Sequence, residues 1–377
     1  MSLNGAYSTD LGGSTGVTWT HRDLSGKADQ LSFGANVINI GGSAAKSLGY
    51  DLNAKYLLPE WGHRDQTLQL AAQALNQSLQ AYDQKALILG ATVTRKLSSI
   101  WSVSVGLTGT VEKIGQEGYT VLTGCPTTGC ALSDQQMAQG DPICTPEMCS
   151  QPIFTTDLLY THYELLAIPI GLLYNTTGLD SPIEDPTHGI RASLTETPTL
   201  SFGHGTAKFF ITQASVSYYL DLHDIKLTGD AGRSIMAFRA LGGLAQGAGQ
   251  FSLPPDQRFY AGGSGTIRGY RYQSVGPTFP NGDPAGGTAI NAGSLEYRQR
   301  IGKSLGFAVF LDGGQVSEVV NPLHAPLRFG AGAGARYYTP IGPIRLDVAL
   351  PIHRRKAAPG QLADDAFEIY IGLGQAF

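Results

Sequence analysis

The sequence lacks any long hydrophobic run. Its longest apolar stretch, Leu165–Tyr174, has ten residues and includes Pro169, whereas a membrane-spanning helix needs about 20. The chain therefore has no segment that would cross a bilayer as a helix. A basic region followed by an apolar stretch is also missing after Met1, so we expect no signal peptide.

Charged residues are scarce as well. Lys and Arg total 26 and Asp and Glu total 30, so 15% of the residues are charged, against about 25% in a typical soluble domain. The formal net charge of −4 excludes a strongly basic nucleic-acid-binding protein. Only 42% of the residues are hydrophobic, and low charge with modest hydrophobicity argues against a soluble enzyme. Because the eight histidines show no metal-ligand spacing, we expect neither enzymatic activity nor a metal or cofactor.

Polar and apolar residues alternate instead, most clearly in the last third of the chain. From 344 to 350 the apolar side chains occupy every second position, with Arg345 and Asp347 between them. In a β-strand this period places the two sets on opposite faces. The pattern recurs at 305–313 and 366–377. The apolar set predicted to face outward comprises Phe307, Val309, Leu311, Ile344, Leu346, Val348, Ile369 and Ile371.

Strands of about ten residues are typical of membrane barrels, because a tilted strand needs about 9–11 residues to cross the hydrocarbon layer. An apolar face opposite a face of Arg, Asp, Glu and Gly matches the lipid-out, lumen-in pattern of outer-membrane proteins. We therefore predict an all-β fold, a 16-stranded antiparallel transmembrane β-barrel that forms one domain over 1–377. The predicted strands are 3–9, 15–21, 29–39, 46–58, 66–75, 83–95, 99–112, 157–173, 188–201, 207–220, 231–244, 288–300, 304–313, 327–338, 342–352 and 366–377.

The four longest predicted connections are 113–156, 245–287, 314–326 and 353–365. Each follows an odd-numbered strand of the predicted order, so all four lie on the same rim of the barrel. Long loops on one rim and short turns on the other are expected of outer-membrane barrels. Both termini would then lie at the periplasmic, short-turn rim.

All four cysteines lie in the first of these loops, with the spacing C-x4-C, thirteen residues, C-x4-C. In an oxidising extracellular space we expect them to form disulfides. A zinc site and free thiols stay open as alternatives, although C-x2-C is the stronger zinc signature. The pairings considered are Cys125–Cys130 with Cys144–Cys149, and Cys125–Cys149 with Cys130–Cys144.

Glycine is abundant, at 49 residues, and is dense in the stretch 258–270. Its spacing does not match a phosphate-binding loop and no helix follows, so the residues alone favour a flexible surface loop. The run 330–335 matches G-x-G-x-x-A but leads into a predicted strand, which argues against a nucleotide site. The cluster of Asp221, His223 and Asp224 could imitate a hydrolase dyad, but solvated residues of a turn are the simpler interpretation.

Several motifs taken together resemble the BamA/TamA surface-antigen superfamily. The stretch 258–277, RFYAGGSGTIRGYRYQSVGP, resembles its sixth loop, and 310–314, FLDGG, resembles its F-x-D-x-G motif. Segments 294–298 and 336–350 are similar to its twelfth strand and its penultimate hairpin, and 6–22 resembles the TamA branch, the outer-membrane subunit of the translocation and assembly module. The resemblance covers nearly the whole chain as the barrel domain, without the periplasmic POTRA modules that precede it in the family.

The resemblance implies that the long glycine-rich loop folds back into the lumen. There Arg268 would pair with Asp312, with Glu296 nearby; alternation independently points the Asp312 carboxylate toward the lumen. Gly265 and Gly269 would permit the tight backbone that this requires, and Tyr270 would pack against the lumen wall.

The resemblance also implies a weak seam between the first and last strands that opens sideways into the membrane. The first strand is short, and glycines weaken the last one by removing side-chain packing, which favours local opening. The same glycines could instead make room for the inserted loop. The candidate seam residues are Leu3, Gly5, Tyr7, Gly372, Gly374 and Phe377.

These features favour an assembly and translocation factor of the bacterial outer membrane that inserts or secretes β-barrel and autotransporter substrates through the seam. The expected partners are outer-membrane lipid, unfolded outer-membrane proteins and an inner-membrane-anchored protein of the TamB type; we expect a monomeric barrel and no nucleic acid. The alternative is a two-partner-secretion transporter or a passive pore. A secretion transporter usually threads a helix through its barrel, and the sequence shows no helical pattern. A porin would have no reason for an R-G-Y loop beside an F-x-D-x-G strand.

Overall fold

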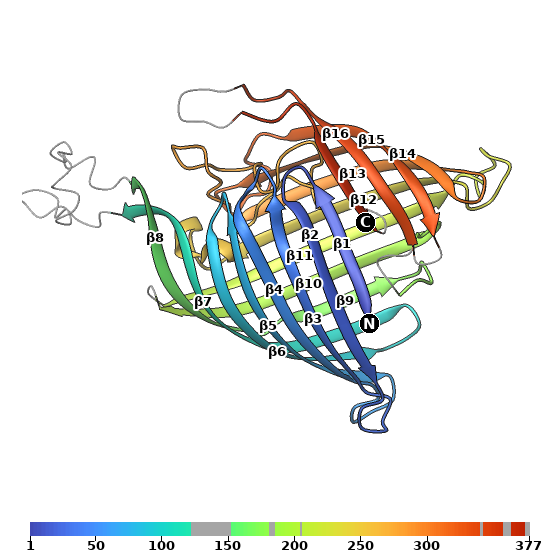
Figure 1. Cartoon of the computed structure of the whole chain (residues 1–377), viewed down its shortest axis with the longest axis horizontal. Coiled ribbons are helices and arrows are strands. Elements are labelled where there is room, and N and C mark those ends of the chain that lie inside the picture. The colour runs from blue at the N-terminus through green and yellow to red at the C-terminus, as the bar shows by residue number, and fades with distance from the viewer. Residues whose placement is uncertain (122–151, 181–184, 204–205, 340–341, 357–362, 374–377) are drawn as a thin grey trace, which may run out of the picture.

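The chain forms one closed antiparallel β-barrel (Figure 1). The structure is a computed structural model that describes residues 1–121, 152–180, 185–203, 206–339, 342–356 and 363–373. Neighbouring strands in the sequence pair with each other, and the first strand closes the barrel on the last. Among the described residues, no helix has the length and apolar character needed to cross a membrane.

The barrel wall contains seventeen strand segments. The connection 247–288 contains two short 3-10 turns. The segments are β1 (Ser2–Ser8), β2 (Gly12–Arg22), β3 (Gln30–Gly41), β4 (Ala45–Leu58), β5 (Gln66–Leu79), β6 (Asp83–Lys96), β7 (Trp101–Val121), β8 (Pro152–Ala167), β9 (Ile170–Asn175), β10 (Gly189–Gly203), β11 (Ala207–Asp221), β12 (Ser234–Gln246), β13 (Ala289–Ile301), β14 (Leu305–Ser317), β15 (Arg328–Thr339), β16 (Gly342–Ile352) and β17 (Glu368–Leu373). The turns are η2 (Gln250–Ser252) and η3 (Pro255–Gln257).

β8 and β9 are two halves of one barrel strand. Both pair with β7 on one side and with β10 on the other. Between them lie Ile168 and Pro169, and a proline has no N–H group to donate to a neighbouring strand. Counted as one strand, they give the predicted sixteen strands, so the predicted fold is confirmed.

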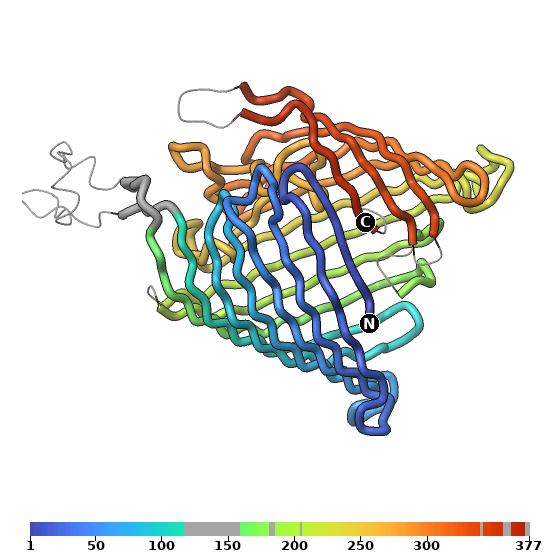
Figure 2. The backbone as a smooth tube through the Cα atoms, in the orientation of Figure 1, coloured from blue at the N-terminus to red at the C-terminus, as the bar shows by residue number. Residues whose placement is uncertain are grey.

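The predicted division into long and short connections is only partly correct. We call the rim that carries the connections 9–11, 42–44, 80–82, 247–288, 318–327 and 353–367 the loop rim. The opposite rim, where β1 begins and β17 ends, is the terminal rim. Figure 2 follows the backbone between these two rims. Three connections of the loop rim have only three residues, and the terminal rim carries the longer connections 176–188 and 222–233. The predicted contrast between the rims is therefore wrong in these places.

The predicted loop 113–156 also began too early. β7 continues to Val121 and β8 begins at Pro152. Gly115 and Gly118 indicate a loop in the sequence, but pairing with β8 extends the ladder through them, with one irregularity between Glu117 and Tyr119. The four cysteines of this connection lie outside the described residues, so the disulfide prediction stays a prediction.

The outward faces of the strands form a continuous apolar band. On β14, Phe307, Val309 and Leu311 are exposed, whereas the alternate residues Phe310 and Asp312 are buried. The predicted outward residues of β16 are exposed in the same way. Exposed apolar surface of this extent is not tolerated in water but matches the hydrocarbon layer of a membrane.

Aromatic side chains border this band near the terminal rim. Trp19 of β2 stacks on Phe33 of β3 with ring centroids 5.9 Å apart, and Trp101 of β7 lies 4.8 Å from Tyr174 of β9. Such aromatic girdles mark the level of the membrane–water interface in outer-membrane barrels. The arrangement therefore positions the apolar band within the bilayer.

Replacing Leu346 with Arg should destabilise the folded barrel, because this exposed residue lies near the middle of β16 on the lipid-facing side. We expect a loss of about 2–4 kcal/mol, the typical cost of a cation at the bilayer midplane. Urea unfolding of the protein folded into lipid vesicles measures this loss. Leu323→Arg, in the exposed connection 318–327, is the matched control and should change the unfolding free energy little. Equal effects of both variants would contradict the assignment of the outer face.

Candidate functional site

The long connection 247–288 enters the barrel and packs against its inner wall. Its buried residues Ile267 and Tyr270 belong to one apolar cluster with Phe209, Ile290 and Val316, which point inward from β11, β13 and β14. Removing this apolar surface from water favours the inserted position of the loop. The residue-based expectation of a flexible surface loop is therefore wrong, and the inward-folded loop implied by the family resemblance is present.

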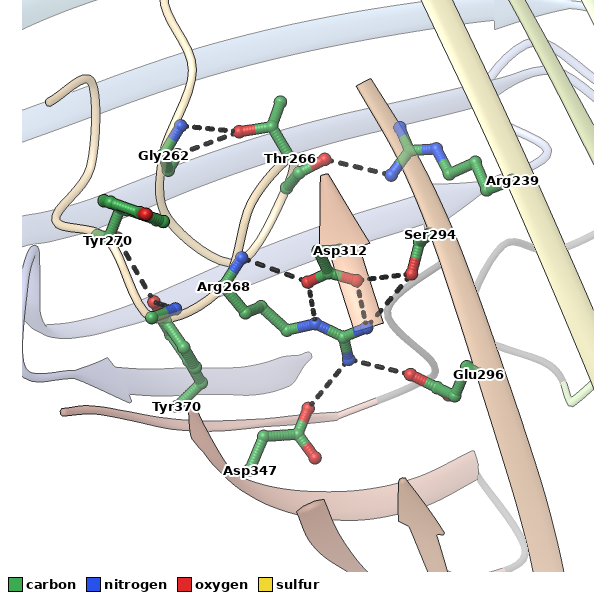
Figure 3. A network of polar contacts seen from close by, with 12 residues as sticks. Arg239, Gly262, Thr266, Arg268, Tyr270, Ser294, Glu296, Asp312, Asp347 and Tyr370 are labelled. Carbon is green, nitrogen blue, oxygen red and sulfur yellow. Dashed lines mark hydrogen bonds and ion pairs between the residues drawn. The ribbon is translucent and has the colours of Figure 1, made fainter. Parts of the chain in front are cut away.

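Arg268, at the tip of this loop, pairs with Asp312 of β14 (Figure 3). Its Nε lies 2.7 Å from Asp312 Oδ2 and its Nη2 2.9 Å from Oδ1, a bidentate arrangement. The backbone N–H of Arg268 also donates to Asp312 Oδ2 at 3.0 Å. Only 2% of the Arg268 surface is exposed. Asp312 thus holds both the side chain and the backbone of the loop tip.

Further groups surround the same guanidinium. Arg268 Nη1 lies 2.7 Å from Glu296 Oε2 on β13 and 3.5 Å from Asp347 Oδ2 on β16. Ser294 donates its hydroxyl to Asp312 Oδ1 at 2.5 Å. The ring of Phe310 lies under the guanidinium, 3.3 Å from its carbon to the ring centroid, within the range of a cation–π contact.

Two more arginines extend this cluster into a balanced network. Arg298 Nε lies 2.8 Å from Glu296 Oε1, and Arg336 forms an ion pair with Asp347. Arg336 also approaches Glu296 Oε1 at 3.7 Å. Burial disfavours the charge of Arg268, but the bond to Asp312 and the nearby carboxylates outweigh it and raise its pKa above the usual value. The group therefore stays charged at any physiological pH.

Only part of this network was predicted from the sequence. The predicted residues Arg268, Asp312 and Glu296 form ion pairs with one another in the structure, with Arg268 as the shared cation. The sequence did not assign Arg298, Arg336, Asp347 and Ser294. Alternation already placed Arg336 and Asp347 on the polar face, which was the available signal, but it could not show that both strands lie beside the loop tip.

Gly269 is required by the backbone at the loop tip. Its φ is +96°, and a Cβ there would lie 2.6 Å from the carbonyl carbon of Leu350. Its N–H donates to the hydroxyl of Tyr370 at 3.1 Å. Gly265 differs, because its φ is not positive and a Cβ would meet open space. The prediction that Gly265 permits a tight turn is therefore wrong; its carbonyl accepts a hydrogen bond from Arg239.

Tyr270 holds the loop against the wall, as predicted. Its side chain is fully buried, and its hydroxyl donates to the carbonyl oxygens of Ile352 at 3.0 Å and Phe329 at 3.2 Å. Nearer the loop rim, Arg258 donates to the side chain of Gln116 on β7 at 2.9 Å. The loop is thus fastened to opposite parts of the barrel wall.

A row of glycines on the inner face of β15 makes room for the network. A Cβ at Gly330 would collide with the carbonyl oxygen of Arg268, and one at Gly334 would collide with the Asp347 carboxylate. At Gly332 it would lie 2.5 Å from the ring of Phe310. Gly330 therefore makes room for the inserted loop itself, and Gly332 and Gly334 make room for the wall residues around it.

Replacing Gly330 with Ala should displace the loop tip, because the new methyl group and the Arg268 carbonyl oxygen cannot occupy the same space. We expect protease cleavage within 247–288 to become at least about tenfold faster, which corresponds to a loss of about 1.4 kcal/mol in loop docking. Ala331→Val, on the outward face of the same strand, is the control and should leave cleavage unchanged. Unaltered cleavage of the Gly330 variant would contradict the inserted position.

The first and last strands meet over a short length. Only Tyr7 and Ser8 of β1 pair with β17, through Ile371 and Tyr370, whereas β1 and β2 pair from Ser2 to Ser8. In Figure 1 the two strands lie side by side toward the loop rim, where these two pairs are. Although β17 continues to Leu373, Gly5 and Ala6 have no register partner on its described residues.

Side chains close the seam at the loop rim. The N–H of Thr9 donates to the Ile369 carbonyl oxygen at 3.0 Å, and the Ile369 N–H donates to Thr9 Oγ1 at 3.0 Å. The Thr9 hydroxyl also bonds the carboxylate of Glu368. The short contact thus ends at a small polar clasp, formed by Thr9, Glu368 and Ile369.

The predicted seam residues have different surroundings. Leu3 and Tyr7 are exposed on the outer face, and a Cβ at Gly5 would meet only ordinary contact distance. A Cβ at Gly372 would lie 3.6 Å from Arg345 Nε, so the nearest neighbour of this glycine is a wall arginine and not the inserted loop. Gly374 and Phe377 lie outside the described residues.

Comparison with known proteins agrees with this architecture. The model of the Omp85 superfamily domain matches residues 23–377. The chain belongs to the Omp85 superfamily. Barrels of this superfamily are bacterial outer-membrane proteins, a location that fits the apolar outer band and its aromatic border.

Individual relatives of this Omp85 barrel share sequence or fold. The chain is 30% identical to the outer membrane protein assembly factor BamA of Nitratidesulfovibrio vulgaris over 139 residues. The aligned region covers 36% of this chain and 17% of that protein. The chain thus spans only a small part of its curated relative. Among solved structures, BamA from Haemophilus ducreyi lacking POTRA domains 1–3 matches with a TM-score of 0.69 and 18% identity, over 99% of this chain and 70% of that one. CdiB from Acinetobacter baumannii matches with a TM-score of 0.59 and 13% identity, over 100% and 60%.

Proposed function

We propose that this Omp85 barrel assembles outer-membrane proteins by pairing an incoming β-strand with the edge of β1. The observation that carries the proposal is the short contact of β1 with β17. In the described part of the chain the two strands share two register pairs, and β17 continues to Leu373 without pairing with Gly5 or Ala6. An exposed strand edge presents free N–H and C=O groups that add a further strand. Unfolded β-barrel and autotransporter substrates offer such strands.

The inserted loop supports this proposal over a passive pore. The tip of 247–288 is held inside the barrel by the Arg268 network and by Tyr270. A loop fixed across the lumen hinders free diffusion of solutes, and the seam offers a route that does not pass through the lumen. We infer that the ion-pair network keeps the loop in place while the seam opens.

A transporter of the two-partner-secretion kind is the second candidate, because the fold also resembles CdiB. In the described residues the helical elements are the turns η2 and η3, of three residues each, and neither is a helix threaded through a barrel. We therefore favour the assembly role. Within that role we propose the TamA type, with an inner-membrane-anchored partner of the TamB type, on the resemblance of residues 6–22.

Insertion of substrate by the purified chain in lipid vesicles tests the assembly role. An unfolded outer-membrane protein is added to vesicles with and without the chain, and its folded fraction is followed by protease resistance. We expect faster insertion with the chain present. Equal rates would contradict an assembly role, whereas rapid efflux of small solutes from the same vesicles would favour a pore.

A further inference from the structure

Two lysines face each other on the outer wall of the barrel near the loop rim. Lys85 of β6 and Lys113 of β7 are directly opposite in the antiparallel register, so their Cβ atoms are about 4.5–5.5 Å apart. Alternation places both on the same outward face as Leu87 and Val111, the next pair toward the membrane, which are 52% and 59% exposed. Like charges directly opposite one another destabilise a sheet.

No ion pair with a described side chain neutralises these two lysines. Outside residues 117–158, whose side chains the structure does not describe, Lys85 forms no ion pair or hydrogen bond. Lys113 Nζ lies 4.8 Å from the centroid of the Tyr160 ring. Asp83 accepts hydrogen bonds from Ser78 at 2.5 Å and from Tyr160 at 3.4 Å. Glu164 of β8, whose side chain the structure describes, forms no ion pair with Lys85 or Lys113.

The lysines border a hollow that offers further polar groups. The hollow has a volume of about 390 Å³ and is lined by both lysines and by Ser47, Asn76 and Tyr160, among others. Two exposed tyrosines lie beside the hollow: Tyr50 is the register partner of Asn76, and Tyr160 lines the hollow itself. Tyrosines of outer-membrane barrels gather at the level of lipid headgroups. The hollow therefore lies at the upper edge of the apolar band.

We propose that Lys85 and Lys113 bind the phosphate of a membrane-lipid headgroup whose acyl chains lie along Leu87 and Val111. A phosphate between the two ammonium groups would remove their repulsion and accept their hydrogen bonds. Ser47 and Asn76 offer further donors at the same hollow, whereas the Tyr160 hydroxyl donates to Asp83, which also lines it. The apolar surface directly below the lysines is the reason that a lipid, and not a soluble anion, is the ligand.

The lipids that remain bound to the full chain after release from nanodiscs test this site, measured by native mass spectrometry. The nanodiscs contain phosphatidylglycerol or, as the probe without phosphate, diacylglycerol with the same acyl chains. Lys85→Glu is the decisive variant, because it creates an opposite-charge pair with Lys113 that supports the fold while removing the phosphate site. Lys208→Gln, an exposed lysine near the loop rim on β11, is the matched control.

We expect the wild-type chain and the Lys208 variant to retain one phosphatidylglycerol. Lys85→Glu should retain it at least about tenfold less, because the substitution removes one cation and places a carboxylate beside the phosphate. Diacylglycerol should not be retained. Equal retention of phosphatidylglycerol by Lys85→Glu would overturn the site. Equal retention of diacylglycerol would overturn the role of the phosphate, and displacement of the lipid by millimolar inorganic phosphate would show a soluble-anion site instead.

Discussion

The Arg268→Ala variant is expected to lose most of its assembly activity while its barrel remains folded. The substitution removes the bidentate bond to Asp312 and the ion pairs to Glu296 and Asp347. It leaves the three buried carboxylates of Glu296, Asp312 and Asp347 without the cation that they share. Removing one partner of a buried ion pair costs about 3–5 kcal/mol. Because the hydrogen bonds between strands do not pass through Arg268, this cost falls on the docking of the loop.

The measurements that check this result are substrate insertion in vesicles and protease cleavage within 247–288. We expect insertion to fall at least about tenfold and cleavage to rise by a similar factor. Arg268→Lys should be intermediate, because an ammonium group keeps the charge but cannot form the bidentate bond. Arg233→Ala is the control: Arg233 and its partner Asp230 are 47% and 66% exposed, and exposed ion pairs contribute little. Full insertion activity of Arg268→Ala with a cleaved loop would show that the loop position is irrelevant to function.

Covalent closure of the seam is expected to abolish insertion. Tyr7 and Ile371 are partners in register on the outer face, so replacing both with cysteine places two thiols within reach of a disulfide. The four native cysteines are replaced with serine in the same chain. Oxidation should reduce insertion to the rate of empty vesicles, and a reductant should restore it.

A second disulfide distinguishes seam closure from general rigidity. Ala333 and Val348 are partners in register between β15 and β16 and also face outward. With both replaced by cysteine in the same background, oxidation should leave insertion unchanged. Full insertion by the oxidised Tyr7–Ile371 pair would mean that the substrate does not use this seam.

Alternation in the sequence was sufficient to predict which side chains face lipid, because period two is a property of the strand itself. It also predicted the inward carboxylate of Asp312. The ends of β7 and β8 could not be predicted, because Gly115 and Gly118 favour a loop locally and only pairing between the two strands extends the ladder through them. Local residue preference and long-range pairing disagree there, and pairing prevails.

The ion-pair network was less accessible from sequence. Arg268, on the loop, meets Glu296, Asp312 and Asp347 from three different strands. No local pattern indicates that a loop between β12 and β13 reaches β16. The space for the loop tip comes in part from Gly330, whose missing side chain leaves room for the Arg268 carbonyl oxygen. A row of small residues in the sequence does not reveal what fills the space beside it.

Crosslinking from the edge of β1 to a substrate during insertion tests the central claim most directly. A photoreactive side chain is placed at Gly5, on the outer face of β1, or at Gly109, on the outer face of β7. Neither site is crowded, because a Cβ meets only Ser14 O at 3.6 Å in the first and no atom within 4 Å in the second. We predict that an assembling substrate crosslinks at position 5 and not at position 109. Equal crosslinking at both positions, or crosslinking at 109 alone, would contradict entry of the substrate through the seam.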